Sequence, residues 1–342
     1  MNNGLKISED FSLLNYNTFG INGIASRFVQ LNTEDDYVAL LKSGLLCEHP
    51  FFVLGGGSNV VLSDWYEGII VHPANKGIRL IETAEDYCLV EASAGEVWAE
   101  FVDHCIYNSW YGVENLAAIP GTVGAAPVQN VGAYGKEAKD VVVRVHAFDV
   151  KTAEERWIEG SECQFGYRQS RFKGEWKNRF IIDKVVFRLS STFVPDLSYK
   201  ALTTALSDRG LTNPTARQLA DIVTAVRDSK LPNPKEIGSA GSFFKNPIVS
   251  NPIYEKIKAT NPDIVAFPVD NESTKLSAGW LIEHSGWKGR TVGRAGVYEK
   301  QALVLVNRGN STGREVRNLA DAIINDIQAK FGVRLECESI FV

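Results

Sequence analysis

The stretch ENLAAIPGTVGAAPVQNVGAYG, residues 114–135, decides the fold of this chain. The residues in it that break helices and strands are Pro120, Gly121, Gly124, Pro127 and Gly132. They force the backbone to bend repeatedly, yet residues 127–135 carry no formal charge. A buried irregular loop has backbone N–H groups to satisfy, and a bound ligand with many acceptor atoms would satisfy them. The pattern predicts either a wall against a flat, polar, uncharged ligand or a packed Ω-loop.

A second glycine-rich stretch follows the apolar run FFVL. It reads Gly55-Gly56-Gly57-Ser58-Asn59, and consecutive glycines allow backbone N–H groups to approach a phosphate closely. The dinucleotide fingerprint GxGxxG fails because Val60 stands where its last glycine is needed, and the phosphate-binding GK[ST] sequence is missing. The motif alone therefore leaves a plain hairpin turn open.

The composition is that of an ordinary globular protein, with 44% hydrophobic and 23% charged residues in a chain of 342. The length predicts more than one domain. A net charge of −5 gives no basic field, so we expect neither nucleic acid nor an acidic membrane as a partner. The N-terminal sequence has no basic segment before an apolar run, and no window suits a membrane-spanning helix, which predicts a cytoplasmic protein.

The cysteines and histidines are scattered singly. Cysteines without CxxC spacing and histidines without paired spacing predict neither a disulfide framework nor a metal site. We expect the cysteines to be small core residues. They are Cys47, Cys88, Cys105, Cys163 and Cys337.

The first 190 residues alternate short apolar runs with turn residues. The expected elements are a strand at 27–31, a helix from Thr33 to Gly44, a strand, glycine loop and strand within 49–72, a strand from Cys88, and a helix with Val97, Phe101 and Cys105 on one face. Residues 140–150 and 179–189 alternate with period two, which predicts antiparallel strands with one solvent-exposed face. This part of the chain is predicted to be α+β.

The apolar pattern weakens around residues 190–202, which predicts a domain boundary. The elements expected beyond it are a helix at 215–230 with Leu219, Ile222, Val223 and Val226 on one side, a hairpin at 292–307, and a helix at 312–332 with Val316, Leu319, Ile323 and Ile327 at helical spacing and Gly332 after its end. They predict a small C-terminal α/β unit. We expect three parts, at residues 1–75, 76–200 and 201–342.

Three further motifs carry residue types with catalytic potential. In FGYRQSRFK, Arg168 could belong to a solvated basic turn or grip a carboxylate. In GSAGSFFKNP, Ser242 lacks the GxSxG elbow of a hydrolase nucleophile, and by itself the motif favours an ordinary loop. In RLECES, Glu336 and Glu338 are expected on one side of a strand.

The motifs, taken in order, resemble a known family. NTFG, LGGGSNVVLSD, residues 114–135, FGYRQSRFK, KLPNPKEIGSAGSFFKNP, KLSAGWLIE, QALVLVN and LECES follow the order found in UDP-N-acetylenolpyruvoylglucosamine reductases, from Asn17 to Glu338. The resemblance implies an FAD-binding domain of the vanillyl-alcohol oxidase type in two subdomains (1–75 and 76–200), followed by a smaller substrate-binding α/β domain. It implies non-covalent FAD, with the glycine loop on its pyrophosphate and residues 127–135 beside the flavin.

The resemblance also implies roles for individual residues. Arg168, Ser242 and Glu338 take the positions of the family's catalytic residues. The implied cofactor contacts are Gly55, Gly56, Gly57, Ser58, Asn59, Pro120, Gly121, Val123, Gly124, Gln129, Asn130, Gly132, Tyr134, Ile182 and Arg227. The implied substrate contacts are Tyr199, Lys230, Asn246, Lys275 and Gln301. No metal is implied.

The reaction implied by the resemblance is the reduction of UDP-N-acetylglucosamine enolpyruvate to UDP-N-acetylmuramate. NADPH would reduce FAD, hydride would pass to C3 of the enolpyruvyl group, and Ser242 would protonate C2. Two departures from the family pattern, Ala125-Ala126 in place of serines and Ile340 in place of an arginine, bear on FAD contacts. The alternatives are a flavin-dependent oxidase and a non-catalytic nucleotide-binding protein. We expect a monomer.

Overall fold

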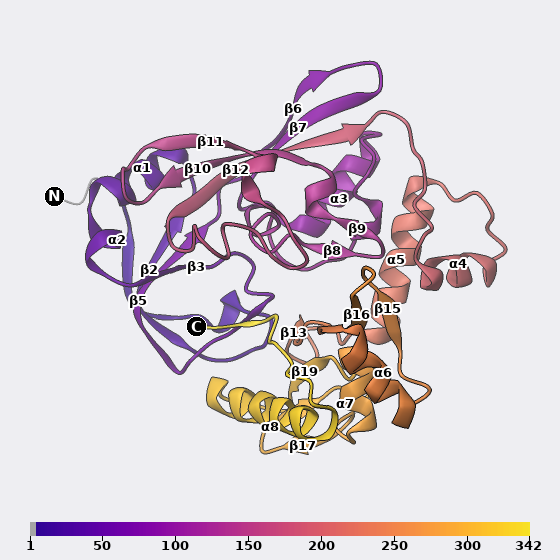
Figure 1. The fold of residues 1–342 in the computed structure, drawn as a ribbon. Helices are drawn as coiled ribbons and strands as arrows, with labels where there is room; N and C mark the ends of the chain where they lie inside the picture. Colours follow the sequence, from indigo (N-terminus) through magenta and orange to yellow (C-terminus); the bar gives the residue numbers. More distant parts are fainter. Residues whose placement is uncertain (1–4) are drawn as a thin grey trace. The chain divides into compact units, whose positions relative to one another are not determined.

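The structure is a computed structural model, and it describes residues 5–342 of the chain. These residues form two compact units, coloured along the chain in Figure 1. The first unit comprises residues 5–11, Ala25–Gly56 and Glu67–Ser229. The second comprises Ser12–Ile24, Gly57–Tyr66 and Lys230–Val342. Both mix helices and strands, so the α+β prediction is confirmed.

The first unit holds two mixed or antiparallel sheets, a small hairpin and five α-helices. Its strands are β1 (Ile7–Ser12), β2 (Ile24–Leu31), β3 (Phe51–Val53), β5 (Trp65–Pro73), β6 (Ile78–Thr83), β7 (Tyr87–Ser93), β8 (Gly132–Ala133), β9 (Lys136–Glu137), β10 (Val142–Asp149), β11 (Glu155–Glu159) and β12 (Phe180–Ser190). Strands β1, β2 and β5 each extend one or two residues beyond the unit. Its α-helices are α1 (Glu34–Lys42), α2 (Leu45–Glu48), α3 (Trp98–Tyr107), α4 (Lys200–Ser207) and α5 (Ala216–Lys230), the last ending one residue beyond the unit. The sheet orders are β1-β2-β5-β3 and β11-β10-β12-β7-β6.

Strand β12 is the central strand of the larger sheet, and both of its faces are covered. Ile181 packs into a core with Tyr37 of α1 and with Phe148, whereas Val185 and Phe187 pack into the core that contains α3. The expectation of one solvent-exposed face on β10 and β12 is therefore wrong for most of their length. The physical reason is that α1 packs against the face of the sheet that the alternating pattern predicted to be exposed to solvent.

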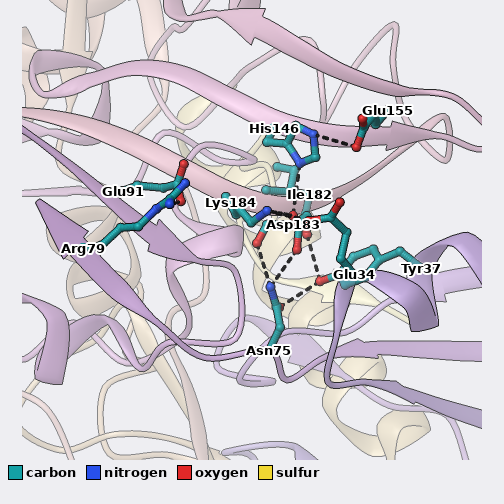
Figure 2. Close-up of polar contacts among 10 residues, drawn as sticks. All are labelled: Glu34, Tyr37, Asn75, Arg79, Glu91, His146, Glu155, Ile182, Asp183 and Lys184. Atoms are coloured by element: carbon teal, nitrogen blue, oxygen red, sulfur yellow. Dashed lines mark hydrogen bonds and ion pairs between the residues drawn. The ribbon is translucent and has the colours of Figure 1, made fainter. Parts of the chain in front are cut away.

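Polar residues on the α1 side of this sheet are buried as a hydrogen-bonded network (Figure 2). Asp183 is 1% exposed, and its carboxylate contacts Asn75 Nδ2 at 2.7 Å, His146 Nδ1 at 3.0 Å and Lys184 Nζ at 3.1 Å. Asn75 Oδ1 accepts a hydrogen bond from Tyr37 of α1 at 2.9 Å. Burial, and then the negative charge of Asp183, raise the pKa of Tyr37 well above its usual range. The network replaces the water that these groups give up on folding.

Local sequence signals explain where the helices begin and end. Helix α1 begins after Thr33, whose backbone N–H donates to Asp36 Oδ2 at 2.9 Å in a capping box. Helix α3 differs from its prediction in one residue, because Val97 precedes the helix and is 36% exposed. Its buried face instead begins with Trp98, whose indole N–H donates to Leu116 O at 2.9 Å.

The second unit contains a four-stranded sheet, a three-stranded sheet and three α-helices. Its strands are β4 (Val60–Val61), β13 (Ser239–Ser242), β14 (Ile248–Ser250), β15 (Ala266–Pro268), β16 (Ser273–Leu276), β17 (Thr291–Val292), β18 (Ala295–Val297), β19 (Val304–Asn307) and β20 (Ile340–Phe341). Its helices are α6 (Asn251–Thr260), α7 (Ala278–His284) and α8 (Gly313–Phe331). The sheet orders are β13-β19-β18-β17 and β14-β16-β15, and β20 pairs in parallel with β4.

Helix α8 and the β18–β19 hairpin confirm the C-terminal predictions. Thr312 caps α8 and accepts from the Glu315 backbone N–H at 3.2 Å, and Gly332 ends it with a φ of 69°. Only glycine adopts that backbone conformation at no steric cost. By contrast, the strand expected through Glu336 and Glu338 is limited to a single bridge between Cys337 and Phe244.

The two-unit division differs from the one expected at residue 200. Leu202, Leu206, Leu219 and Val223, from α4 and α5, lie in the same core as β7 and α3, which explains why these helices belong to the first unit. The three-part division stays a prediction. Three cysteines are buried as expected, but Cys47 is exposed and Cys337 is half-buried, because neither lies on a core-facing position. Within residues 5–342, we find no helix with the length and apolarity to cross a membrane.

Candidate functional site

Two glycine-rich loops of the first unit approach each other closely. A Cβ atom added to Gly56 would lie 2.9 Å from the Cα atom of Gly121, and one added to Gly55 would lie 2.7 Å from Thr122 Oγ1. Real side chains essentially never show contacts that short. The backbones can therefore meet only because residues 55 and 56 are glycine, and the two glycine-rich loops lie side by side at this point.

The loop at 114–135 is docked on the segment between β7 and α3. The backbone N–H of Val123 donates to Glu96 O at 2.9 Å, and that of Gly124 donates to Ala94 O at 2.9 Å. A Cβ on Gly124 would lie 2.5 Å from Ala94 Cβ. Protein carbonyls thus satisfy these two amides, so for residues 122–126 the packed-loop alternative describes the structure and no ligand is needed to explain the burial.

The second half of that loop is tied to the turn that carries Arg168. Asn130 is fully buried, and its Nδ2 donates to Gly166 O at 3.0 Å and to Glu137 Oε2 at 2.9 Å. Arg168 Nη2 donates to Gly132 O at 2.6 Å. The side chain of Asn130 is therefore used to hold the arginine turn. Its assignment as a cofactor contact stays a prediction.

Backbone strain gathers in the same two loops. Among non-glycine residues with positive φ are Ala118 (55°), Asn130 (47°), Tyr134 (49°), Gln164 (46°) and Arg168 (54°). Such conformations persist only where the surroundings impose them, and they cluster at functional sites. Asn130 and Arg168 are themselves held by hydrogen bonds, from Asn130 to Gly166 O and from Arg168 to Gly132 O.

Tyr134 is the point where these loops meet helices α4 and α5. Its ring lies edge-to-face on Tyr199, with centroids 5.2 Å apart and an interplanar angle of 87°. The pKa of Arg227 on α5 is lowered, mainly by burial and also by the positive charge of Arg168. Tyr134 and Asp228 partly offset this shift. The structure thus brings Tyr134, Arg168, Tyr199 and Arg227 into one region of the first unit. Ile182, by contrast, is 5% exposed and packs in the core.

In the second unit, Ser242 is presented by an irregularity in strand β13. The pairing of β13 with β19 shifts register between Ser239 and Ser242, and Gly241 has a φ of 67°. A bulge of this kind re-aims the side chain that follows it. Ser242 is exposed at the end of the strand.

Glu338 lies on the backbone segment beside Ser242. Its N–H donates to Phe243 O at 2.8 Å, and its carbonyl accepts from Asn59 Nδ2 at 3.2 Å. Ile340 N–H donates to Asn59 O at 3.0 Å, next to the β4–β20 pair. The structure therefore joins the Gly57–Asn59 half of the glycine loop to the Glu338 segment, a link that no local motif in the sequence signals. Gly57 is itself confined, since a Cβ there would collide with Tyr16 O.

The first turn of α7 gathers two of the expected substrate residues. Asn246 Oδ1 accepts from the Ala278 N–H at 2.9 Å, and Gln301 Oε1 would lie 3.4 Å from a Cβ on Gly279. Lys230 is exposed at the end of α5. The structure brings Asn246 and Gln301 together and places Lys275 just before the same helix, on β16.

Lys275 stands in a cross-strand row that sequence reasoning missed. It pairs with Ile248 of β14 on one side and with Phe267 of β15 on the other, so the three side chains share a face of the sheet. Ile248 is 51% exposed and Phe267 50% exposed. The missed signal was a set of apolar residues on short strands around a lysine.

The comparisons with known proteins agree along the length of the chain. Residues 25–159 match the model of an FAD-binding domain, and residues 233–342 match that of the C-terminal domain of UDP-N-acetylenolpyruvoylglucosamine reductase. A curated UDP-N-acetylenolpyruvoylglucosamine reductase of Bdellovibrio bacteriovorus is 45% identical over 98% of this chain and 99% of its own. One from an Azoarcus species is 44% identical over 99% and 98%.

A solved structure supports the fold. The crystal structure of UDP-N-acetylenolpyruvylglucosamine reductase from Thermus caldophilus superposes with a TM-score of 0.67 at 23% identity and covers 99% of both chains. The expected FAD-binding domain of the vanillyl-alcohol oxidase type, with a C-terminal domain of its own kind, is confirmed.

Proposed function

The chain belongs to the family of UDP-N-acetylenolpyruvoylglucosamine reductases, and we propose that it reduces UDP-N-acetylglucosamine enolpyruvate to UDP-N-acetylmuramate. The observation that carries the proposal is the 45% identity to a reductase of that name across 98% of the chain. The proposal includes NADPH as the hydride donor, the cytoplasm as the location and a monomer as the assembly.

FAD is the cofactor, and the residues of the first unit fit it. Gly55 and Gly56 leave room where a side chain would collide with Gly121 and Thr122, which suits a loop that must approach a pyrophosphate. Ala125 and Ala126 supply no hydroxyl, and their backbone N–H groups donate to Thr122 O and Val123 O, so the proposal assigns no FAD contact to these two positions. When bound, FAD would supply the redox chemistry, the transfer of a hydride from NADPH to C3 of the enolpyruvyl group.

We assign Arg168 to the substrate carboxylate. Hydride addition at C3 leaves an electron pair delocalised over C2 and the carboxylate, and a guanidinium stabilises that charge best when it is held in place beforehand. The bond from Arg168 Nη2 to Gly132 O holds one edge of the group.

We assign Ser242 as the donor of the proton that C2 receives. A serine hydroxyl is a weak acid, so it protonates only a strongly basic centre such as this enolate. Glu338, whose backbone is bonded to the residue after Ser242, would share the protonation step or orient the enolate.

The remaining assignments concern substrate contacts. Lys230, Asn246, Lys275, Gln301 and Tyr199 are proposed to bind the sugar nucleotide. Lys275 has the strongest structural support, because a cation between two exposed apolar side chains suits a nucleotide with its anionic diphosphate and planar base.

Product analysis under anaerobic conditions tests the reaction. Purified holoenzyme with NADPH and UDP-N-acetylglucosamine enolpyruvate should give a product heavier by one hydride and one proton, with one NADPH oxidised for each product formed. Oxidation of NADPH only when oxygen is admitted, without a reduced sugar nucleotide, would instead show an oxidase and overturn the proposal.

A further inference from the structure

Asn115 joins two segments that carry residues of the candidate site. It lies in the short 3-10 helix Glu114–Leu116 and is 2% exposed. Its Nδ2 donates one hydrogen bond to Tyr134 O at 2.9 Å and another to Asp196 O at 3.0 Å. Tyr134 belongs to the loop at 127–135, and Asp196 lies on the segment that leads into Tyr199. One buried carboxamide thus uses both of its hydrogens to bridge the two.

Further contacts between the same segments show that the bridge is built into the fold. Lys136 Nζ lies 3.3 Å from Asp196 Oδ2, and Asp196 Oδ1 accepts from the Ser198 N–H at 3.0 Å. A Cβ on Gly135 would lie 2.7 Å from Ser198 Oγ, so the two segments are in direct contact. Above the bridge, Tyr134 and Tyr199 make the edge-to-face contact described above.

The segment at 191–199 depends on such contacts for its position. It has neither helix nor strand, Val194 in it is 78% exposed, and Tyr199 itself is 47% exposed. An exposed tyrosine at the end of an irregular segment is placed by whatever fixes that segment's backbone. The buried donor that fixes it at Asp196 is the Asn115 amide.

We propose that Asn115 is a positioning residue that sets the affinity for the sugar nucleotide by holding Tyr199 against Tyr134. The inference rests on the proposed function, because the substrate role of Tyr199 does. The bridge requires a side chain with two N–H donors. An aspartate of the same shape would place carboxylate oxygens against the two carbonyl oxygens, and a serine could donate to only one of them.

The test compares Asn115→Asp with Asn307→Asp as a matched control. Asn307 Nδ2 likewise donates to two carbonyls of a distant segment, Phe19 O at 3.0 Å and Gly20 O at 3.3 Å, and it has no assigned role in the site. Asn115→Asp removes both hydrogen bonds and is expected to raise the KM for the sugar nucleotide at least about tenfold, since about 1.4 kcal/mol corresponds to a factor of ten, with kcat retained. Asn307→Asp should leave that KM unchanged. If Asn115→Asp does not fold, Asn115→Ser serves, with a smaller rise in the same direction.

A double-mutant cycle separates positioning from general loosening. Tyr199→Ala should raise the same KM, and Asn115→Asp combined with it should add nothing, because the group that Asn115 holds is already gone. Fully additive effects, or a KM unchanged by Asn115→Asp in an active enzyme, would overturn this inference alone. A wild-type enzyme that neither binds nor reduces the sugar nucleotide would overturn the proposed function, and this inference with it.

Discussion

Replacement of Gly56 by alanine tests the idea that two glycine loops form the cofactor site. The new Cβ would lie 2.9 Å from Gly121 Cα and 3.3 Å from the Gly121 carbonyl carbon, so the loops must separate by several tenths of an ångström. Overpacking of this kind costs about 1–3 kcal/mol. Because the strain falls on the two loops that the proposal assigns to FAD, part of this cost should appear as weaker FAD binding. FAD affinity should then fall by about tenfold or more, since about 1.4 kcal/mol corresponds to a factor of ten.

The assay is a fluorescence titration of deflavinated protein with FAD, alongside urea unfolding of the apoprotein. Gly44→Ala is the matched control: Gly44 has a φ of 74°, but nothing lies within 4 Å of an added Cβ. It should lose about 1–2 kcal/mol of stability from backbone strain and keep its FAD affinity. A Gly56→Ala protein that binds FAD as tightly as the wild type would refute the reasoning.

Three further predictions concern Ser242, the buried network and helix α8. Gly241 has a φ of 67° and open space around it, so Gly241→Ala should lower the stability of the protein by about 1–2 kcal/mol through backbone strain. It should also lower kcat while FAD affinity is retained. An unchanged kcat in steady-state assays would mean that the bulge does not orient Ser242. Asp183→Ala should destabilise the protein by about 3–5 kcal/mol in urea unfolding, because it leaves buried partners unpaired. The control Asp86→Ala, at an exposed ion pair with Arg188, should cost at most about 1 kcal/mol. Equal losses of stability would show that the buried network stabilises the protein no more than an exposed ion pair does. Hydrogen bonds from Arg294 and then Thr312 lower the pKa of Glu315 from 4.5 to about 2, so its contribution to stability is present above pH 4.5 and lost as the pH falls toward 2. The difference in unfolding midpoint between wild type and Glu315→Gln should shrink over that window, and a difference that does not vary with pH would contradict the assignment.

Much of the fold could be predicted because the signals are local. Apolar periodicity identified α5 and α8, the Thr33-x-x-Asp36 pattern placed the start of α1, and Gly332 marked the end of α8. The solvent-exposed face predicted for β10 and β12 failed because coverage of a sheet depends on distant segments. The buried Asp183 network is a second reason for this error. A polar residue in a strand usually faces solvent, whereas the Asp183 side chain faces Asn75 and His146.

The candidate site was predictable as residue types but not as contacts. The motifs pointed to Arg168, Ser242 and Glu338, yet nothing near Asn59 in the sequence shows that its amide reaches the Glu338 carbonyl 279 residues away. Likewise the sequence predicts Asn130 as a ligand-facing carboxamide, a prediction that stays open, but it does not show that the Asn130 amide donates to Gly166 O of the arginine turn. Asn115 was overlooked because a single asparagine in an apolar run carries no pattern. Only the folded backbone reveals which carbonyls lie within its reach.

The most direct test of the account is an anaerobic stopped-flow measurement of the flavin absorbance with wild type and Ser242→Ala. NADPH should bleach the flavin of both proteins at similar rates, because Ser242 is assigned no part in that step. Addition of UDP-N-acetylglucosamine enolpyruvate should restore the colour quickly in the wild type and about 10²–10⁴-fold more slowly in Ser242→Ala, the usual contribution of a general acid. Colour that returns equally fast in both would contradict the assignment of Ser242, and colour that returns only with oxygen would contradict the reductase.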